Sequence, residues 1–244
     1  MARSARIKSE SNIYHVMLRG NNRQQIFLDS EDNQHFLDVL IQCREISQFG
    51  LYAYCLMGNH IHLLLCADAE PLEQVMKRIS TRYVIWYNHK YSRIGHLFQD
   101  RYKSEAVEDN AYFLTVLRYI LNNPVKAGIC QKAEDYPWSS AKDYFTGSGI
   151  TDTAFAEEMN GREALLEYLK EASEDACMDD LPLRISDREA GEIIVKLVGK
   201  KNLSACLKAV SDHPERYVRK LRSSGLSIRQ ICKLTGLSFG IVRK

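Results

Sequence analysis

The stretch LYAYCLMGNHIHLLLCA, residues 51–67, contains two apolar runs that are separated by two turn-forming residues. Gly58 and Asn59 both tolerate the backbone angles that a tight hairpin turn requires. The runs on either side have the length and apolar character of strands that pair with each other. We therefore predict a β-hairpin over residues 51–67, and we interpret the rest of the chain around it.

The returning arm of this hairpin carries a histidine pair, His60 and His62, on either side of Ile61. On a strand, residues i and i+2 project from the same face, while the residue between them points to the opposite face. On a helix the same pair would diverge by about 200°. Two imidazoles on one strand face can converge on a metal ion, although a His-X-His triplet alone more often marks ordinary surface or hydrogen-bonded histidines.

The periodicity of apolar residues places further elements on both sides of the hairpin. These are a strand at 12–18, a helix at 30–49, a helix at 72–89, a strand at 101–107 and a helix that starts at Asp109 or Asn110 and is ended by Pro124. The order β-α-β-β-α-β-α predicts an α+β sandwich, in which helices pack on a face of an antiparallel sheet.

The helix before Pro124 carries a second candidate pair, Tyr119 and Asn123. Residues four apart share one helix face, so a phenol and an amide are presented together. Taken alone, Tyr119 is more typical of a half-buried core aromatic than of a functional residue, and Asn123 alone is also typical of a residue that ends a helix before Pro124.

Charge is segregated along the chain although the formal net charge is only +2. Residues 77–103 contain seven Lys/Arg and one acid, with six aromatics among them, whereas residues 152–192 contain 13 acids and four bases. Residues 193–244 contain 12 bases and two acids. Basic side chains neutralise phosphates and aromatic rings such as Trp86, Tyr87 or Tyr91 can stack on unpaired bases, so the first block suits a nucleic acid. We expect about half of these aromatics to belong to the core, since Tyr83, Trp86 and Tyr87 fall at helical spacing.

Three regions follow from these shifts: a domain at 1–146, an acidic connector with a helix at 147–186, and an all-α C-terminal region at 187–244. Near the end, Ser227 and Ser238 are placed to cap two short helices around the turn at Gly236, and Leu226, Leu234 and Leu237 would pack the pair. This pattern predicts a helix-turn-helix that presents Phe239, Arg243 and Lys244 to DNA. A plain helical hairpin with a solvated basic face is the alternative.

The composition also excludes several classes of protein. No apolar run reaches the roughly 20 residues of a membrane-spanning helix, and the basic start is not followed by the apolar segment of a signal peptide. The seven cysteines are scattered without a CxxC pair, which argues against a zinc ribbon or a disulfide framework. We therefore expect a cytoplasmic protein with no membrane partner.

Several motifs in the correct order resemble the single-tyrosine HUH transposases, and in particular their REP-associated branch. They lie within residues 8–145 and comprise LMGNHIHLL at 56–64, GHLFQDRY at 95–102, RYILNNPVKAG at 118–128 and YPWSS at 136–140.

The resemblance implies a ferredoxin-like catalytic domain that holds Mg²⁺ or Mn²⁺ with His60, His62 and Asn123. It implies that Tyr119 attacks a DNA phosphate, leaving a 5′-phosphotyrosine link and a free 3′-OH. The implied partner is single-stranded DNA with hairpin or palindromic ends, without a nucleotide cofactor, and a homodimer is possible. The residues predicted to bind DNA are Lys77, Arg78, Arg82, Lys90, Arg93, Arg101, Lys103, Arg229, Arg243 and Lys244.

Two other readings stay open at this point. One is a DNA-binding regulator that has lost the chemistry, against which the intact His60, His62 and Tyr119 argue. The other is a different HUH nuclease, either a replication initiator or a conjugative relaxase. Relaxases usually carry a third histidine shortly after the pair, whereas the next histidine here is His89, on a predicted helix.

Overall fold

The computed structural model describes residues 8–171, 177, 187–200, 202–224, 226 and 228–243. The chain divides into two compact units, residues 1–178 and residues 179–244. The domain boundaries expected at 146/147 and 186/187 remain predictions.

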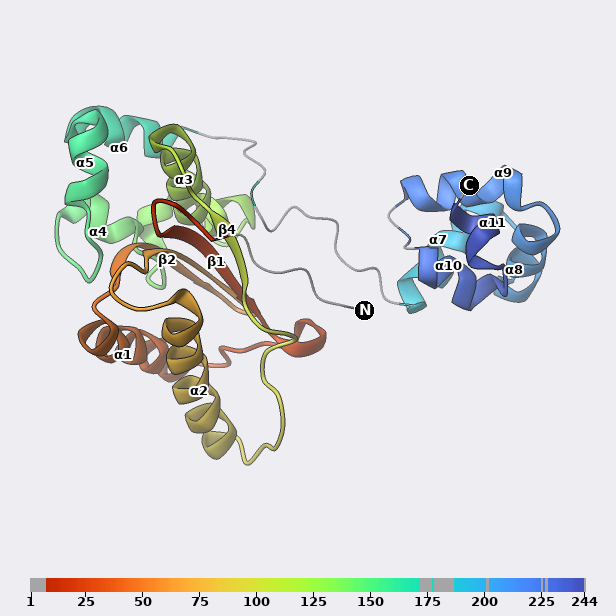
Figure 1. Cartoon of the computed structure of the whole chain (residues 1–244), viewed down its shortest axis with the longest axis horizontal. Helices are drawn as coiled ribbons and strands as arrows, with labels where there is room; N and C mark the ends of the chain where they lie inside the picture. Colours follow the sequence, from red (N-terminus) through yellow and green to blue (C-terminus); the bar gives the residue numbers. More distant parts are fainter. Residues whose placement is uncertain are drawn as a thin grey trace. The chain divides into compact units, whose positions relative to one another are not determined.

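A four-stranded antiparallel sheet forms the centre of the first unit (Figure 1), in the order β2-β3-β1-β4. Its strands are β1 (Ile13–Arg19), β2 (Gly50–Met57), β3 (His60–Cys66) and β4 (Lys103–Ala106). β2 and β3 form the predicted hairpin, with Met57 paired to His60 across the turn. β1 pairs with β3 on one side and with β4 on the other, so β1 and β3 are the two central strands.

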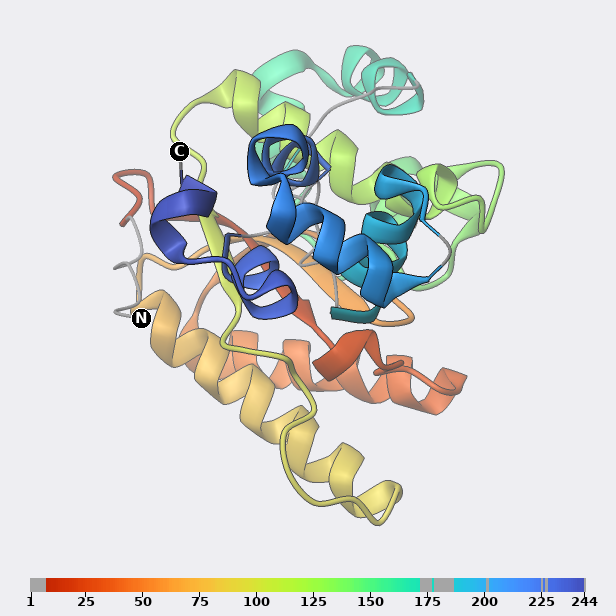
Figure 2. The same ribbon diagram turned by 90° about the vertical axis from the view of Figure 1, so that its right-hand side faces the viewer.

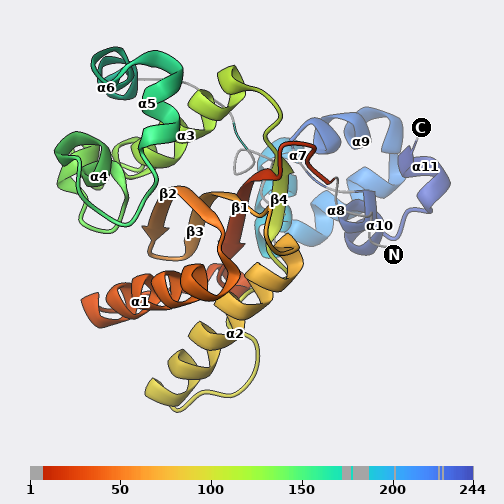
Figure 3. The same ribbon diagram turned by 60° about the vertical axis from the view of Figure 1, so that its left-hand side comes forward.

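One face of the sheet is covered by α1 (Ser30–Ser47) and α2 (Leu72–Lys90), as Figures 1 and 3 show. Figure 2 shows α2 crossing α1, with which it is in contact. Asp29 and Asp32 form a capping box that starts α1. The strand residues that point to this side, among them Val16 and Ile61, are fully buried in an apolar core.

The other face is covered by α3 (Asn110–Lys126), which packs against β2 and β3. Asp109 caps α3 by accepting a hydrogen bond from the backbone N–H of Tyr112. The segment that follows forms α4 (Ala141–Thr146), α5 (Ala154–Asn160) and α6 (Arg162–Lys170) on the same side (Figure 3). The predicted α+β sandwich is confirmed, with helices on both faces of the sheet. Two short 3₁₀ helices, Asn21–Arg23 and Ala133–Asp135, complete this unit.

The prediction that Pro124 ends the tyrosine helix is wrong, because α3 continues through Pro124 to Lys126. The fixed φ of proline is compatible with a helix, and the ring removes only one N–H donor. The last turn keeps its carbonyls bonded, since Ala127 donates to Asn123 O and Ile129 donates to Pro124 O. Asn123 is therefore helical, contrary to the bias expected for a residue before proline.

In its described residues, the second unit contains only helices, as predicted for the all-α C-terminal region. It comprises α7 (Asp187–Val198), α8 (Leu203–Asp212), α9 (Pro214–Ser223), α10 (Ile228–Thr235) and α11 (Phe239–Arg243). Its apolar core includes Ile194, Val210, Leu221, Leu226 and Ile231.

The end of this unit has the geometry of two helices joined by a tight turn. Gly236 has a φ of 75° in the turn between α10 and α11, a conformation that glycine adopts without a steric penalty. Leu234 and Leu237 pack against the unit's core. The predicted cap Ser227 and the predicted DNA contact Lys244 lie outside the described residues. In the part of the chain that the structure describes, no helix is long and apolar enough to cross a membrane.

Candidate active site

The sheet face that α3 covers carries a row of polar side chains on its two central strands. Because strand residues alternate, Ile61 enters the apolar core under α1 and α2 while His60 and His62 project toward α3. The register places Arg19 of β1 opposite His60, and Met17 opposite His62. The strand geometry predicted for the histidine pair is thus present.

Tyr119 of α3 lies over these histidines. The ring centres of His60 and His62 are 5.1 Å apart with the planes at 89°, and the Tyr119 ring centre lies 5.6 Å from that of His62. His62 is fully buried and Tyr119 is 6% exposed. The structure therefore brings together the histidine pair and the tyrosine, which are almost sixty residues apart in the sequence.

The hydrogen bonds at Nδ1 orient both imidazoles of the pair. His60 Nδ1 lies 2.7 Å from Oδ1 of Asn59, and His62 Nδ1 lies 3.0 Å from Nε2 of His15. An amide oxygen can only accept, so His60 carries its proton on Nδ1 and keeps the lone pair of Nε2 for another partner. A hydrogen bond from the second ring nitrogen is the usual arrangement of a metal-binding histidine.

Two further side chains of α3 share the face of Tyr119. Asn123 follows one turn later and is 8% exposed. Lys126 follows after two turns, and its Nζ lies 5.4 Å from the centre of the Tyr119 ring. The spacing i, i+4 and i+7 therefore aligns a phenol, an amide and a cation along one side of the helix.

The predicted metal ligands form a mixed donor set of two imidazoles and one amide. Within the described ranges, no group of three or more His, Cys, Asp or Glu side chains is arranged to hold a metal ion. His60, His62 and Asn123 include only two residues of those types, so this result does not test the predicted set. Two imidazole nitrogens and an amide oxygen are suitable ligands for a divalent ion and would leave positions for phosphate oxygens. The residues thus fit the implied group.

Sequence reasoning missed three residues of this site: His15, Arg19 and Lys126. His15 is fully buried, and its ring centre lies 6.0 Å from that of Tyr119. The available signal was the alternation of β1, where His15 and Arg19 occupy one face among apolar neighbours. Lys126 fell beyond the predicted end of its helix, so its place on the Tyr119 face went unnoticed.

Most of the basic residues predicted to bind DNA from 77–103 lie away from the histidines, on α2. Arg78 pairs with Glu70, and Arg82 donates to Gln42. Lys90 contacts the carboxylates of Asp29, Glu31 and Asp32. Although burial opposes the charge of Lys90, these hydrogen bonds raise its pKa.

Other members of the predicted set are more open to solvent. Lys77, Arg101 and Lys103 are exposed, as are Arg229 and Arg243 in the second unit. Lys103 lies on β4 opposite Met17, which places it on the same sheet face as the histidine pair. Arg93 donates to Gln24 and lies over the Tyr87 ring.

Two aromatic residues of α2, Tyr83 and Tyr87, belong to the core. This agrees with the expectation that about half of the aromatics in 77–103 are core residues. Tyr83 is fully buried and donates to Ile26 O, and Tyr87 is 2% exposed. Trp86 stacks on His35 with ring centres 4.0 Å apart. Stacking of Tyr87 on a DNA base is therefore incompatible with its burial.

Two other tyrosines close in sequence to Tyr119, Tyr102 and Tyr112, are less suitable as nucleophiles. Tyr102 is 9% exposed and packs in the apolar core under α1 and α2, on the other face of the sheet from the histidine pair. Burial and a hydrogen bond to Glu105 raise the pKa of Tyr112, which disfavours its phenolate.

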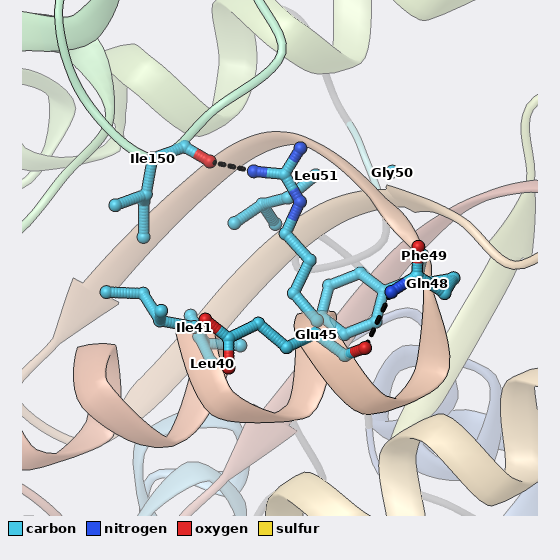
Figure 4. Close-up of a pocket in the computed structure, with 9 residues that line it drawn as sticks. Leu40, Ile41, Glu45, Gln48, Phe49, Gly50, Leu51 and Ile150 are labelled. Atoms are coloured by element: carbon cyan, nitrogen blue, oxygen red, sulfur yellow. Dashed lines mark hydrogen bonds between the residues drawn. The ribbon is translucent and has the colours of Figure 1, made fainter.

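A separate cavity of about 530 Å³ opens beside α1 and the start of β2 (Figure 4). Its lining includes Leu40, Ile41 and Phe49. Arg44 also lines it and donates a hydrogen bond to Ile150 O. None of the histidines, nor Tyr119, lines this cavity. It is therefore distinct from the candidate active site.

The fold and site define a class: an α+β domain in which a histidine pair on a central strand faces a tyrosine on the covering helix. Residues 8–123 match the family model described as IS200-like transposase. This match agrees with the resemblance to transposases found in the sequence.

Two solved structures are similar to the chain. One is a REP-associated tyrosine transposase bound to a REP hairpin, with a TM-score of 0.52 and 18% identity, covering 63% of this chain and 93% of that one. It shares the fold. The other, a candidate transposase from Deinococcus radiodurans R1, has a TM-score of 0.36 and 19% identity over 49% of this chain and 96% of that one. This score does not establish a shared fold. No curated protein matches the chain.

Proposed function

We propose that the first unit cuts and rejoins single-stranded DNA through a covalent bond to Tyr119. The observation that carries the proposal is the position of the Tyr119 ring, 5.6 Å from that of His62 on the polar face of the sheet. A buried phenol above two oriented imidazoles is suited to phosphoryl transfer, because nucleophile and charge-stabilising groups meet at one point.

In this proposal the Tyr119 hydroxyl loses its proton and its oxygen attacks the phosphorus of one DNA phosphodiester. The Tyr119 O–P bond forms as the P–O3′ bond breaks, and the leaving oxygen takes up a proton to become a free 3′-OH. The reverse attack by a 3′-OH rejoins the strand. One phosphodiester bond is exchanged for another, so no ATP is needed.

His60, His62 and Asn123 would hold Mg²⁺ or Mn²⁺, which would supply electrophilic stabilisation of the phosphate. The chain's own contribution is to fix that set. Asn59 and His15 orient the two imidazoles, and α3 holds Asn123 one turn from Tyr119. Lys126 adds a positive charge beside the nucleophile.

For the substrate we propose DNA with hairpin or palindromic ends. The structurally similar transposase was solved with a REP hairpin. Arg101 and Lys103 are exposed and are proposed to contact the phosphates, together with the other basic residues predicted in 77–103. In the second unit, Arg229 and Arg243 are exposed and are proposed to contact duplex DNA. A cytoplasmic location and a homodimer belong to the same proposal.

A gel experiment tests this function. The full chain is mixed with single-stranded hairpin oligonucleotides labelled at the 5′ or the 3′ end, with Mn²⁺, Mg²⁺ or EDTA, and resolved under denaturing conditions. We expect a metal-dependent covalent adduct that retains the segment 3′ of the nick. Binding of hairpins without any cleavage would instead favour the DNA-binding regulator.

A further inference from the structure

His15 lies behind the histidine pair in the middle of the polar face. It is 0% exposed and comes from β1, the strand next to His60 and His62. Its Nε2 lies 3.0 Å from Nδ1 of His62, and the two ring centres are 5.2 Å apart with the planes at 31°. A third imidazole therefore contacts His62 within the buried part of the site.

The direction of this hydrogen bond decides what His62 presents to the site. If His62 donates from Nδ1, its Nε2 keeps a lone pair that a metal ion can use. If His15 donates instead, His62 must carry its proton on Nε2 and presents an N–H group. A neutral imidazole has one donor nitrogen and one acceptor nitrogen, so the two arrangements exclude each other.

The proposed metal site requires the first arrangement, because a metal ligand must present a lone pair, and its other ring nitrogen usually donates a hydrogen bond to an outer partner. His15 is then the acceptor through Nε2 and, as a neutral imidazole, carries its own proton on Nδ1.

We propose that His15 is a positioning residue for His62. Its Nε2 accepts the His62 Nδ1 proton, which fixes the tautomer and the ring orientation of His62 and leaves the Nε2 lone pair for the metal ion. Asn59 acts in the same way on His60, from the hairpin turn. This inference rests on the proposed function, in which the His62 lone pair binds the metal ion.

The hydrogen bond can be tested without metal or DNA. Nitrogen-15 NMR of the imidazole rings in the full chain, at a pH above roughly 7.5 where free imidazoles are neutral, distinguishes the two tautomers. We expect His62 to be protonated on Nδ1 and His15 on Nδ1. A His62 that carries its proton on Nε2 would overturn the proposal.

Metal binding provides the second readout. We expect His15→Leu to weaken Mn²⁺ binding, measured by calorimetry on the full chain, by about 10–100-fold, the usual effect of losing an outer partner of a ligand. His15→Gln keeps an acceptor oxygen near the former Nε2 and should stay within about threefold of the wild type. His35→Gln, which alters a histidine that stacks on Trp86, is the matched control and should bind Mn²⁺ as the wild type does.

The outcomes separate this inference from the proposed function. Equal Mn²⁺ affinity of His15→Leu and the wild type would overturn the role of His15 while leaving the function intact. A folded His15→Gln that binds as poorly as His15→Leu would also count against an acceptor role. Should His15→Leu fail to fold, His15→Gln and the wild-type NMR spectrum decide. A wild type that neither binds Mn²⁺ nor forms the adduct contradicts the proposed function, and the tautomer measurement then judges the hydrogen bond alone.

Discussion

The two faces of the sheet are built from the same four strands and both bury apolar side chains, but they differ in their buried polar groups. Under α1 and α2 the strands contribute apolar side chains such as Val16, Ile61 and Leu63, all at 0% exposure. Under α3 the same strands contribute His15 and His62, also at 0% exposure. Burying imidazoles has a cost that hydrogen bonds must offset. The comparison indicates that the α1/α2 face mainly supplies stability, while the α3 face also contains a buried polar site.

The largest expected effect comes from removing one tyrosine hydroxyl on each face of the sheet. Tyr119→Phe should reduce covalent adduct formation on the order of 10⁴-fold or more, because it removes the hydroxyl proposed as the nucleophile. Tyr83→Phe, the matched control, removes a hydroxyl that donates to Ile26 O at 2.6 Å and should lower the free energy of unfolding by about 1–2 kcal/mol. Denaturing gels and urea unfolding measure the two effects. Adduct formation by Tyr119→Phe at the wild-type rate would place the nucleophile elsewhere.

The next effect concerns the histidines. We expect His60→Ala to weaken Mn²⁺ binding by more than about 100-fold and to reduce cleavage in parallel, because His60 is proposed to be a ligand rather than an outer partner. His35→Ala should leave both unchanged, since His35 packs on Trp86 on the other side of the sheet. Calorimetry and the adduct assay provide the measurements. Cleavage that persists in EDTA would remove the metal from the mechanism.

A smaller effect is expected for two lysines from the same basic block. Lys103→Ala should weaken hairpin binding and reduce the salt dependence of log K by about 1, as expected for one lost phosphate contact. Lys90→Ala should change DNA binding less, because Lys90 is paired with Asp29, Glu31 and Asp32. Its loss should instead lower stability. Binding titrations at several salt concentrations make the comparison, and equal losses for both variants would contradict it.

The smallest effect concerns pH and the α1/α2 side. Hydrogen bonds, chiefly from Arg78, lower the pKa of Glu70 from 4.5 to about 2. A depressed carboxyl pKa stabilises the fold above pH 4.5, and this contribution is lost as the pH falls toward about 2. Glu70→Gln should therefore have a melting temperature that falls less steeply over this range than that of the wild type. Identical acid profiles would show that the ion pair does not stabilise the fold.

Short sequence patterns were sufficient to predict much of the fold. The turn at Gly58 and Asn59, the alternation around Ile61 and the cap at Asp109 all act over a few residues, and each is confirmed in the structure. Pro124 was misjudged because a proline's effect depends on whether its missing hydrogen bond can be spared, and here the last turn of α3 tolerates it.

By itself, the sequence determined the order of elements, the strand face shared by His60 and His62, the helix face shared by Tyr119 and Asn123, and the resemblance that joins them. Only the tertiary structure decided which other groups meet them. The contact between His15 and His62 spans 47 positions and depends on the β1–β3 register, which no short pattern encodes. In the same way, only the packing of α1 against α2 engages Lys90 in ion pairs, because a charge pattern gives the sign of a patch but not the partners that the fold brings to it.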